Sequence, residues 1–565
     1  MRVFLALCLS PALGFLVPST PSFISKSSTK TPISPITLLS KKDALESPKV
    51  ESTSMGLTDE YRANIPTNRD TETPSNSTSY SNSPAQVSVD RSLTPQQKLD
   101  KQLRVCFKFG GSSLADASRI DHVANLIKDQ IELGYFPQAV VCSAMGKTTN
   151  NLLNAGEFAL DFAAGGNKGK VNIDPVRTLT QNTIREFGME DMSVTEEVES
   201  LLQEAEDMLR GVKLLQELSP RSLDHLVSFG ERISVRIMAA RLNQIGVPSV
   251  AFDSWEIGMI TNSEFGDATI LPDTAARIRR TFESKIDPQT VAVVTGFVAQ
   301  DSMNRITTLG RGGSDLTATA IGAALGLDEI QVWKDVNGIM SCDPRMVPAA
   351  VPIERVSFEE ASELAYFGAK VLHPIAMQPA MLKQIPVRVK NSYNPSHPGT
   401  VIQNRDKTKL VTAITCKRDI QLIDIKSTRM LGAYGFLANV FNAFERNKLS
   451  VDVLASSEVS ISLTLDKKHH IDTQKHPILQ ELKEVSKLTV KENMGIITLI
   501  ADVDRSSEVL CSIFKIFMIE GIKVEMLSQG ASKVNISVII SDDDLERTVK
   551  ALHSRFFEEG VVSEP

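Results

Sequence analysis

The chain has 565 residues with 61 basic and 68 acidic side chains, which give a formal net charge of -7. A chain of this length is too long for a single hydrophobic core, so two to four domains are expected. The interspersed charges exclude a broad basic surface for nucleic acid, and the six widely spaced cysteines, without any CxxC pair, exclude a structural zinc site.

Residues 1–99 differ in composition from the rest of the chain. Arg2 is followed by an apolar run, residues 3–17, that has the length of a signal-peptide core and is short for a membrane span. The stretch that follows, up to Lys42, is rich in Ser, Thr, Pro and Lys and has no acidic residue, which is typical of transit peptides. This order resembles the two-part plastid leader of algae whose plastids have extra membranes. We therefore expect a mature protein in the plastid stroma, outside any membrane; a plain secretory leader or a disordered tail is the alternative. Residues 44–99 are predicted to be a disordered linker.

The folded part begins with an apolar strand, Val105-Cys106-Phe107, that ends in a glycine-rich turn. The segment Lys108-Phe109-Gly110-Gly111-Ser112-Ser113 follows the strand, and residues 114–127 have helical periodicity. Backbone without a Cβ can approach a polyphosphate closely, and the amides that open a helix point at the anion. This segment therefore predicts a phosphate-binding loop, to which Lys108 adds a positive charge.

A second loop of the same kind is Gly310-Arg311-Gly312-Gly313-Ser314-Asp315, and together the two loops predict a phosphate clamp. Gly146-Lys147-Thr148 resembles the end of a Walker A loop, but Val141 stands where that motif needs its first glycine. The chain lacks the His-Arg-Asp and Asp-Phe-Gly motifs of protein kinases. A GxGxxG motif is excluded as well, because Asp315 occupies its last glycine position.

Between Arg104 and Val401, apolar strands alternate with helical stretches, which predicts an α/β domain with a largely parallel sheet. Charged or glycine-rich segments follow nearly every strand. Ligands of such sheets bind at the carboxyl ends of the strands, so these segments are expected to converge on one crevice. The further strand candidates are residues 139–142, 249–252, 291–294, 329–333 and 387–389.

The last part of the chain contains an internal repeat. Residues 440–444 match 513–517, and 449–454 match 522–527, both at an offset of 73, and 458–463 match 533–538 at an offset of 75. Each copy is predicted to form strand, helix, strand, strand, helix and strand. The pattern resembles ACT regulatory domains, small units that pair side by side and hold amino acids at the seam. A duplicated unit used only for dimerisation is the alternative.

Five motifs together resemble the aspartate kinases of the amino-acid kinase superfamily, most of all the monofunctional plastid enzymes of plants. The resemblance runs from about Arg104 to Glu558 and rests on residues 107–113, 228–232, 308–315, 333–344 and 367–374. It implies an amino-acid kinase fold over residues 100–410, which is an α/β fold with a mainly parallel sheet between helices. Two α+β ACT domains of ferredoxin-like fold are expected to follow, at residues 411–492 and 493–565.

The resemblance implies transfer of the γ-phosphoryl group of ATP to the side-chain carboxylate of L-aspartate, the first step toward lysine, threonine, methionine and isoleucine. The substrate carboxylate itself attacks, so the protein's tasks are positioning and charge neutralisation. By match to the family, Lys108 acts at the transferring phosphoryl group and Asp315 organises the catalytic lysines. Ser314 and the backbone of Gly312 and Gly313 can donate hydrogen bonds. The structural alternatives are an exposed lysine at a strand end and, for Asp315, a helix N-cap.

For aspartate, the family match assigns Arg311 to the α-carboxylate, Glu231 to the ammonium group and Thr149 to a small donor, with Ser314 beside them. A guanidinium group binds a carboxylate through two hydrogen bonds. Glu231 could instead be an acid that the helix dipole favours in the first turn of its helix. The loop around Thr149 departs slightly from bacterial spacing, which leaves Thr148 as the alternative donor.

For ATP, the resemblance implies contacts from the first glycine loop and from later segments. Mg²⁺ is expected to bridge the β- and γ-phosphates, held largely by ATP oxygens and waters, with no protein cage of its own. A tyrosine often stands in the family where this chain has Met340. The expected nucleotide contacts are Lys108, Gly110, Gly111, Ser112, Lys334, Asp335, Met340, Arg345, Lys370 and Val371.

The first ACT repeat matches the residues with which lysine-inhibited aspartate kinases hold L-lysine. Asp452 and Glu458 suit an ammonium group, and Gly435 would let backbone approach the ligand carboxylate. Lys523 and Glu525 give the second copy a different chemistry, so lysine is expected at the first copy alone, with threonine and S-adenosylmethionine left open as further effectors. The expected lysine contacts are Met430, Gly435, Ser450, Val451, Asp452, Ser457 and Glu458. A homodimer or a higher homo-oligomer through the ACT units is also implied.

Two other functions remain as alternatives. A kinase for another amino acid, such as glutamate or N-acetylglutamate, would share the glycine loops but lacks this combination of Glu231, the second glycine loop and paired ACT repeats. A catalytically inactive amino-acid sensor would keep the repeats. The presence of Lys108, Asp315, Arg311 and Glu231 argues against the sensor.

Overall fold

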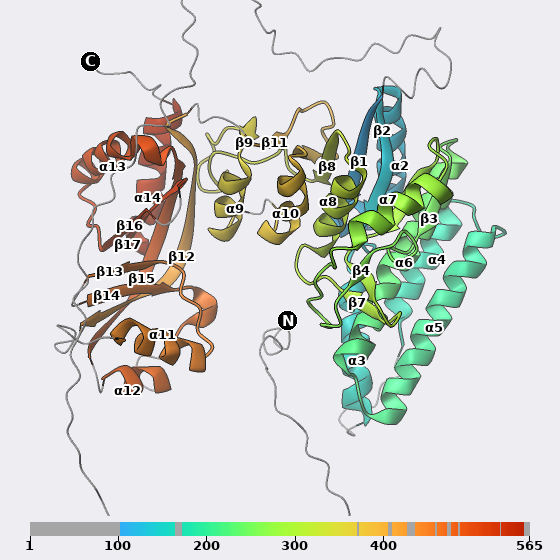
Figure 1. Ribbon diagram of the computed structural model, residues 1–565, viewed down its shortest axis with the longest axis horizontal. Helices are drawn as coiled ribbons and strands as arrows, with labels where there is room; N and C mark the ends of the chain where they lie inside the picture. Colours follow the sequence, from blue (N-terminus) through green and yellow to red (C-terminus); the bar gives the residue numbers. More distant parts are fainter. Residues whose placement is uncertain are drawn as a thin grey trace, which may run out of the picture. The chain divides into compact units, whose positions relative to one another are not determined.

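The computed structural model describes residues 102–163, 172–369, 372–404, 409–426, 435–457, 460–471, 476–483, 486–530 and 533–558 (Figure 1). The expected leader and linker lie outside the described residues, as do four of the predicted site residues: Lys370, Val371, Met430 and Glu458. Within the described ranges, no helix combines the length and the apolar character that crossing a bilayer requires.

An eight-stranded sheet organises residues 103–402, with its strands in the order β3, β5, β2, β1, β8, β10, β11, β9. The central strand β1 runs parallel to both β2 and β8, and every pairing in this sheet is parallel except that of β10 with β11. The predicted parallel sheet and its strands are confirmed. The strands are β1 (Leu103–Phe109), β2 (Tyr135–Cys142), β3 (Ser249–Phe252), β5 (Val291–Thr295), β8 (Glu329–Lys334), β9 (Arg355–Val356), β10 (Val387–Asn391) and β11 (Thr400–Ile402).

Helices cover both faces of this sheet, because its central strands present apolar side chains on both sides. Phe107 and Phe109 belong to a core that α2 and α6 complete, whereas Cys106 belongs to a second core that α8 and α10 share. A separate small sheet contains β4, β6 and β7. The remaining elements of this part are α2 (Ala117–Glu132), α3 (Thr148–Ala163), α4 (Asp174–Glu186), α5 (Ser193–Leu215), α6 (Pro220–Gln244), β4 (Ile260–Thr261), α7 (Thr274–Lys285), β6 (Val298–Asp301), β7 (Ile306–Thr308), α8 (Gly313–Leu325), α9 (Phe358–Tyr366) and α10 (Pro374–Lys383).

The helix predicted from residue 114 begins at Ala117 instead. Asp116 caps it, since its carboxylate accepts a hydrogen bond from the backbone N–H of Arg119 at 3.0 Å. A short 3₁₀ turn, η2 (Gly111–Leu114), comes between the strand and the helix. The glycines after β1 therefore lie in their own turn, and the amides that open α2 are not continuous with them.

Two long antiparallel strands, β12 (Val411–Lys426) and β15 (Lys487–Ala501), form the middle of a six-stranded sheet in the order β13, β14, β12, β15, β17, β16. The pairing of β12 with β15 is irregular near Asp419 and Asn493, and both residues have positive φ. The other elements here are α11 (Phe436–Arg446), β13 (Leu454–Ser456), β14 (Ser460–Leu465), η3 (Lys467–His469), α12 (Pro477–Lys483), η4 (Val503–Arg505), α13 (Ser506–Glu520), β16 (Met526–Gln529), β17 (Asn535–Ser541), α14 (Asp542–His553) and a final π-helical turn, η5 (Ser554–Glu558).

The two ACT units share these long strands instead of following one another. Ile423 and Ile425, in the second half of β12, belong to the core that α11 and α12 cover, which we call the first ACT unit. Val411 and Ile414, in the first half, belong to the core that α13 and α14 cover, the second ACT unit. The expected boundary at residue 411 assigned all of β12 to the first unit. In the structure, residues 411–417 precede the first unit along the chain but form a strand of the second unit. Val411 and Ile414 explain the difference, since both are buried in the core of the second unit.

Candidate active site

The side chains of Lys108 and Asp315 form an ion pair, with Nζ and Oδ1 2.6 Å apart and each side chain about 11% exposed. Lys108 lies near the carboxyl end of β1, and Asp315 lies in the first turn of α8. Lys334 ends the neighbouring strand β8. Burial lowers the pKa of Lys334, Asp315 opposes that shift, and Lys108 adds to it, so the three charges lie within electrostatic reach of one another. The two predicted glycine loops therefore meet at this edge of the sheet.

The second glycine loop requires its glycines for backbone conformation and for close approach. Gly310 and Gly312 have φ of 65° and 75°, a region that side chains disfavour. A Cβ on Gly312 would lie 2.6 Å from Cβ of His373, and one on Gly313 would lie 2.9 Å from the ring of Phe297. The loop thus packs against its neighbours through its backbone, and its last glycine, Gly313, is the first residue of α8.

The first glycine loop packs against the loop that follows β2. A Cβ on Gly111 would lie 2.8 Å from the carbonyl oxygen of Ala144, and Gly146 N–H donates to the carbonyl of Gly111 at 3.0 Å. Gly110 lies beside the ammonium of Lys108, which is 3.7 Å from where its Cβ would be. Ser112 lies on the exposed side of the same turn.

A cavity of about 300 Å³ opens where these segments meet. The predicted residues Thr149, Glu231 and Ser314 line it together with the Lys108–Asp315 pair, although they come from α3, α6 and α8. Thr148, the alternative donor, is buried against Gly230 instead. The remaining lining residues are Phe297, Gly310, Gly312 and Gly313. Arg311 is exposed and is not among the lining residues.

Glu231 is almost fully buried, with 3% of its surface exposed. Its Oε1 accepts a hydrogen bond from Ala144 N–H at 3.2 Å, and its Oε2 has no hydrogen-bond partner among the described residues. Burial raises the pKa of Glu231 to about 8. Gly230 makes this approach possible, because a Cβ there would lie 2.8 Å from Cβ of Ala144. The cavity therefore contains a carboxyl group with one free oxygen, which a cationic ligand would satisfy.

Two residues of this region, Phe297 and Asp224, could not be identified as part of the site by their sequence motifs. Phe297 lines the cavity and has a φ of 70°, a value at which an aromatic residue is an outlier. Two hydrogen bonds hold its backbone there: its N–H donates to Thr317 Oγ1 at 3.2 Å, and its carbonyl accepts from Leu309 N–H at 2.8 Å. Its position directly after the buried strand β5 and Gly296 was the available signal.

Asp224 supports the second glycine loop from the helix that also carries Glu231. Its Oδ2 accepts hydrogen bonds from the N–H groups of Thr308 and Gly266, and its Oδ1 accepts from Thr308 Oγ1, all at 2.9 Å. Thr308 lies two residues before Gly310. Asp224 thus ties α6 to the start of the loop, so the wall that carries Glu231 and the wall that carries Ser314 are held together.

The predicted nucleotide residues divide into two groups. Gly110, Gly111, Lys334 and exposed Asp335 lie at the carboxyl ends of β1 and β8, close to the Lys108–Asp315 pair. Met340 and Arg345 lie farther along the segment after β8 and do not line the cavity. The guanidinium of Arg345 is largely exposed and pairs with Asp343 at 2.6 Å.

The predicted effector residues lie in the first ACT unit. Gly435 is the N-cap of α11 with φ of 86°, Ser450 and Val451 precede β13, and the hydroxyl of Ser457 lies 2.8 Å from that of Ser460. Asp452 already has partners: its Oδ2 lies 2.9 Å from the ammonium of Lys417, and its Oδ1 accepts from the hydroxyl of Tyr366 at 3.3 Å.

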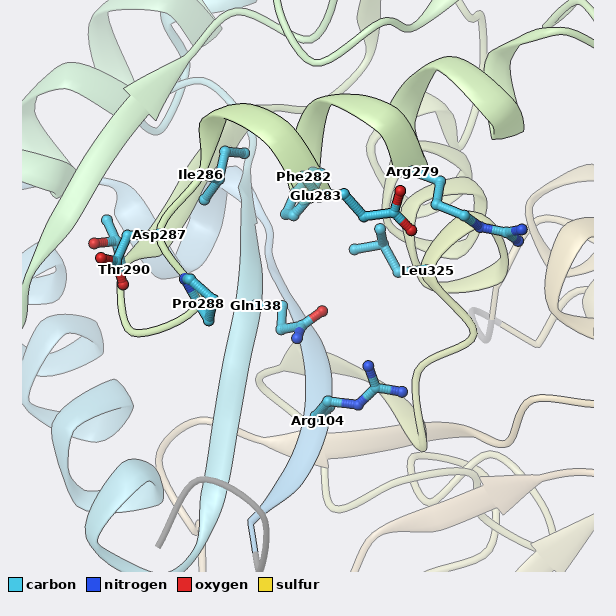
Figure 2. A pocket seen from close by; sticks show the side chains of 10 residues that line it. All are labelled: Arg104, Gln138, Arg279, Phe282, Glu283, Ile286, Asp287, Pro288, Thr290 and Leu325. Carbon is cyan, nitrogen blue, oxygen red and sulfur yellow. The ribbon is translucent and has the colours of Figure 1, made fainter. Parts of the chain in front are cut away.

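A separate cavity of about 270 Å³ lies toward the amino ends of β1 and β5 and contains none of the predicted residues. Figure 2 shows Arg104 and Gln138 on one side and Arg279, Phe282 and Glu283 of α7 on the other. Its two guanidinium groups donate to carbonyl oxygens at the end of α8, Arg104 to Gly326 at 3.2 Å and Arg279 to Ala324 at 3.0 Å. These arginines thus cap a helix C-terminus, where positive charge is favourable.

Comparisons with known proteins match this arrangement. The amino acid kinase family matches residues 104–391, and an ACT domain matches residues 501–556. Aspartokinase 3, chloroplastic, from Arabidopsis thaliana is 48% identical over 479 residues, covering 82% of this chain and 83% of the relative. Lysine-sensitive aspartokinase 3 from Escherichia coli is 34% identical, covering 80% of this chain and 99% of the relative. The crystal structure of E. coli aspartokinase III with aspartate and ADP (R-state) is similar with a TM-score of 0.64 and 32% identity, covering 81% of this chain and 100% of that one. The T-state structure of that enzyme with lysine and aspartate gives 0.67 and 31% at the same coverage.

Proposed function

The chain belongs to the amino acid kinase family and, within it, to the aspartokinases, and on that premise we propose how its own residues carry out the reaction. It is an aspartate kinase, which transfers the γ-phosphoryl group of ATP to the side-chain carboxylate of L-aspartate. A bond forms between a carboxylate oxygen and the γ-phosphorus, and the bond from that phosphorus to the β,γ-bridging oxygen breaks. The bridging oxygen keeps the electron pair and leaves with ADP, so no proton transfer from the protein is required.

The observation that carries the proposal is the Lys108–Asp315 ion pair between the two glycine loops. Phosphoryl transfer places negative charge on the transferring group and on the leaving oxygen, and fixed cations stabilise it without reorganisation. Asp315 holds the ammonium of Lys108 at the mouth of the loops, with Lys334 nearby. Lys108 would neutralise charge on the transferring phosphoryl group, and Asp315 would keep Lys108 in place as the charge develops.

The cavity beside this pair supplies the groups that L-aspartate needs. The free oxygen of Glu231 would accept the ammonium group of the substrate, and Thr149 and Ser314 would donate to its carboxylates. Arg311 directly precedes the lining residue Gly312, from where its guanidinium would close over the α-carboxylate. Phe297 supplies an apolar wall. Binding in this position directs the side-chain carboxylate toward Lys108.

The nucleotide would lie along the carboxyl ends of β1 and β8, with its phosphates against Gly110, Gly111 and Lys108. The described residues contain no group of three or more His, Cys, Asp or Glu side chains that could hold a metal ion. Asp315 lies beside Lys108, next to the expected phosphate position, which fits the way Mg²⁺ binds through substrate phosphates and few protein ligands. Mg²⁺ would thus be bound mainly by ATP and would reduce the charge of the β- and γ-phosphates when present.

We further propose feedback inhibition by L-lysine at the first ACT unit, a homodimer through the ACT units, and a plastid location. The named lysine sensitivity of one relative and the chloroplastic names of others support these assignments. The strands β13 and β16 end the strand order of the ACT sheet, and they contact each other within the chain, where Ser528 Oγ donates to the carbonyl of Leu454 at 3.4 Å. Sedimentation of the purified protein would show the oligomeric state.

The function is tested by measuring ADP release from Mg-ATP by a protein of residues 99–565. The assay is run with L-aspartate, with glutamate in place of aspartate, and with aspartate and added lysine. Aspartate-dependent turnover that lysine suppresses is the expected result. Turnover with glutamate alone would establish a different amino-acid kinase. Lysine binding without any turnover would establish the sensor.

A further inference from the structure

The segment after β8, residues 335–347, is fixed by the second ACT unit as well as by the kinase sheet. Ser341, at its centre, is fully buried. Its N–H donates to Val351 O at 2.8 Å, and its carbonyl accepts from Ile414 N–H of β12 at 2.7 Å. Cys342 and Val347 belong to the core of the second ACT unit, and Met346 contacts Cys416 with their sulfur atoms 3.8 Å apart.

His553, the last residue of α14, contacts the same serine. Its Nε2 lies 2.9 Å from Ser341 Oγ, and its Nδ1 lies 2.9 Å from Oε1 of Glu558. The ring is fully buried and stacks on Phe557 with centroids 4.8 Å apart.

The carboxylate of Glu558 is an acceptor, so Nδ1 carries a proton toward it. On the other side of the ring, Nε2 is hydrogen-bonded to Ser341 Oγ, which also accepts from Val351 N–H at 2.9 Å. The hydroxyl of Ser341 and both ring nitrogens of His553 therefore have hydrogen-bond partners in this buried network.

The order Ser341, His553, Glu558 resembles a hydrolase triad, but its surroundings do not suit hydrolysis. Both Ser341 and His553 have no exposed surface. Among the described residues, none of the main cavities is lined by them. A nucleophile without access to substrate cannot react, so the contact positions the segment that it holds.

We propose that His553 is a positioning residue for the nucleotide: through Ser341 it holds residues 335–347 in the conformation in which Met340 and Arg345 contact ATP. This inference rests on the proposed function and on the nucleotide contacts of Met340 and Arg345 that the family resemblance implies. The kinase sheet anchors the beginning of the segment next to Lys334, and the end of the chain anchors its middle. ATP affinity therefore depends on α14 of the second ACT unit, whereas aspartate binding at Glu231 does not.

The test compares His553→Ala, His553→Gln and Ser341→Ala in the full chain, with KM for ATP, KM for aspartate, kcat and binding of a fluorescent ADP as readouts. The side-chain amide of glutamine can reach Ser341, so His553→Gln should restore most of what His553→Ala loses. Thr548→Val is the matched control, because it removes a buried hydroxyl of α14 that bonds to Asp544 O of its own helix. Melting temperatures of all variants separate misfolding from weakened binding.

We expect His553→Ala and Ser341→Ala each to raise KM for ATP and the dissociation constant of ADP roughly tenfold. Each variant loses one buried hydrogen bond, and residues 335–347 are then slightly displaced. KM for aspartate and kcat should stay within about twofold, and the double variant should be no worse than either single one. An unchanged ADP affinity with a lower melting temperature would overturn the proposal, as would equal increases of both KM values. Measuring ADP binding to the wild type separates the proposed function from the proposed role of His553. Wild type that binds ADP but does not turn over aspartate would refute the proposed function alone. Wild type that binds no ADP would refute both proposals.

Discussion

The ammonium of Lys417 lies 2.9 Å from the carboxylate of Asp452, so the residue expected to hold an effector ammonium already holds one from its own chain. Lys417 also lies over the rings of Tyr366 and Phe367, at 4.7 and 5.5 Å from their centroids. The second ACT unit has a related pair, Lys491 with Glu525 at 2.6 Å. Only in the first unit does the carboxylate also bond to a tyrosine of α9. An effector that displaced Lys417 would thus act on α9 directly.

Replacing Lys417 by glutamine should make the enzyme more sensitive to lysine, because the competing ammonium is gone. A partly buried ion pair contributes about 1 kcal/mol, so half-inhibition should require roughly fivefold less lysine. Inhibition curves of the two proteins measure the shift. Lys468→Gln, which removes an exposed positive charge from the same unit, should leave the curve unchanged. Weaker inhibition in Lys417→Gln would mean that Lys417 takes part in holding the effector.

Replacing Asp452 by alanine should have the opposite effect and abolish lysine inhibition, because the effector ammonium loses its carboxylate. Turnover without lysine should remain close to that of the wild type. Isothermal titration with lysine checks binding independently of turnover. Full lysine sensitivity in this variant would show that the effector binds elsewhere.

Replacing Lys108 by alanine should lower kcat by about 10² to 10³, the usual cost of removing one fixed charge that stabilises a transition state. ADP release under saturating ATP and aspartate measures the loss. The variant should still bind lysine, which shows that the chain is folded. Turnover within a few fold of the wild type would remove Lys108 from the catalytic role.

The pKa of Glu231 near 8 predicts how aspartate binding depends on pH. Below pH 8 the empty site holds a proton that must leave before the substrate ammonium can pair with the carboxylate. KM for aspartate should therefore fall about tenfold per pH unit between pH 6 and 8 and level off above 8. Glu231→Gln should raise KM and remove this pH dependence. A flat profile for the wild type would contradict the assignment.

The same pKa shift has a consequence for stability. The folded-state pKa lies above the ordinary value of 4.5, so the folded chain binds the proton more tightly than the unfolded chain does. Stability from this residue is complete below pH 4.5 and is lost as the pH rises toward 8. Glu231→Gln should therefore melt at a higher temperature than the wild type at pH 8, and the difference should shrink at pH 5. Thermal melts at the two pH values check the sign.

Replacing Asp224 by alanine should reduce kcat/KM for aspartate about 10²-fold, although Asp224 has no contact with the substrate. Alanine would leave the N–H groups of Thr308 and Gly266 without the carboxylate oxygen that now accepts both hydrogen bonds. The loop from Gly310 to Ser314 would then lose its tie to α6, and misplacement by about 1 Å costs this much. Thr308→Val, which removes one of the three bonds, should cost roughly tenfold. Equal rates for both variants and the wild type would show that the loop holds itself in place.

The elements that the sequence predicted well are those in which local pattern and final position coincide. The strand at Val105 to Phe107 is apolar because both of its faces are buried, and the glycines after it are needed where backbones touch. The spacing of Gly310 to Asp315 likewise reflects a helix start that has no room for side chains. Lys108 and Asp315 could therefore be predicted as neighbours, although 206 residues separate them along the chain.

The parts that the sequence did not predict depend on contacts between distant segments. The left-handed conformation of Phe297 is imposed by Thr317 and Leu309, and nothing in its own residue type indicates it. Comparing the two repeats detects matching strands and helices, but it cannot show that residues 411–417 complete the second copy. The pairing of Asp452 with Lys417 has the same origin, because Lys417 lies on that shared strand.

The shared strands also affect how the protein can be made. Chains are synthesised from the amino end and their domains generally fold in that order. The strand segment at Val411 is synthesised before the two elements that cover it. These are β15, which ends at Ala501, and α14, which ends at His553. A prematurely terminated chain could complete the eight-stranded sheet but would keep the apolar side of Val411 and Ile414 uncovered. Chaperones and proteases recognise exposed apolar surface, so we expect unfinished chains of this protein to be degraded.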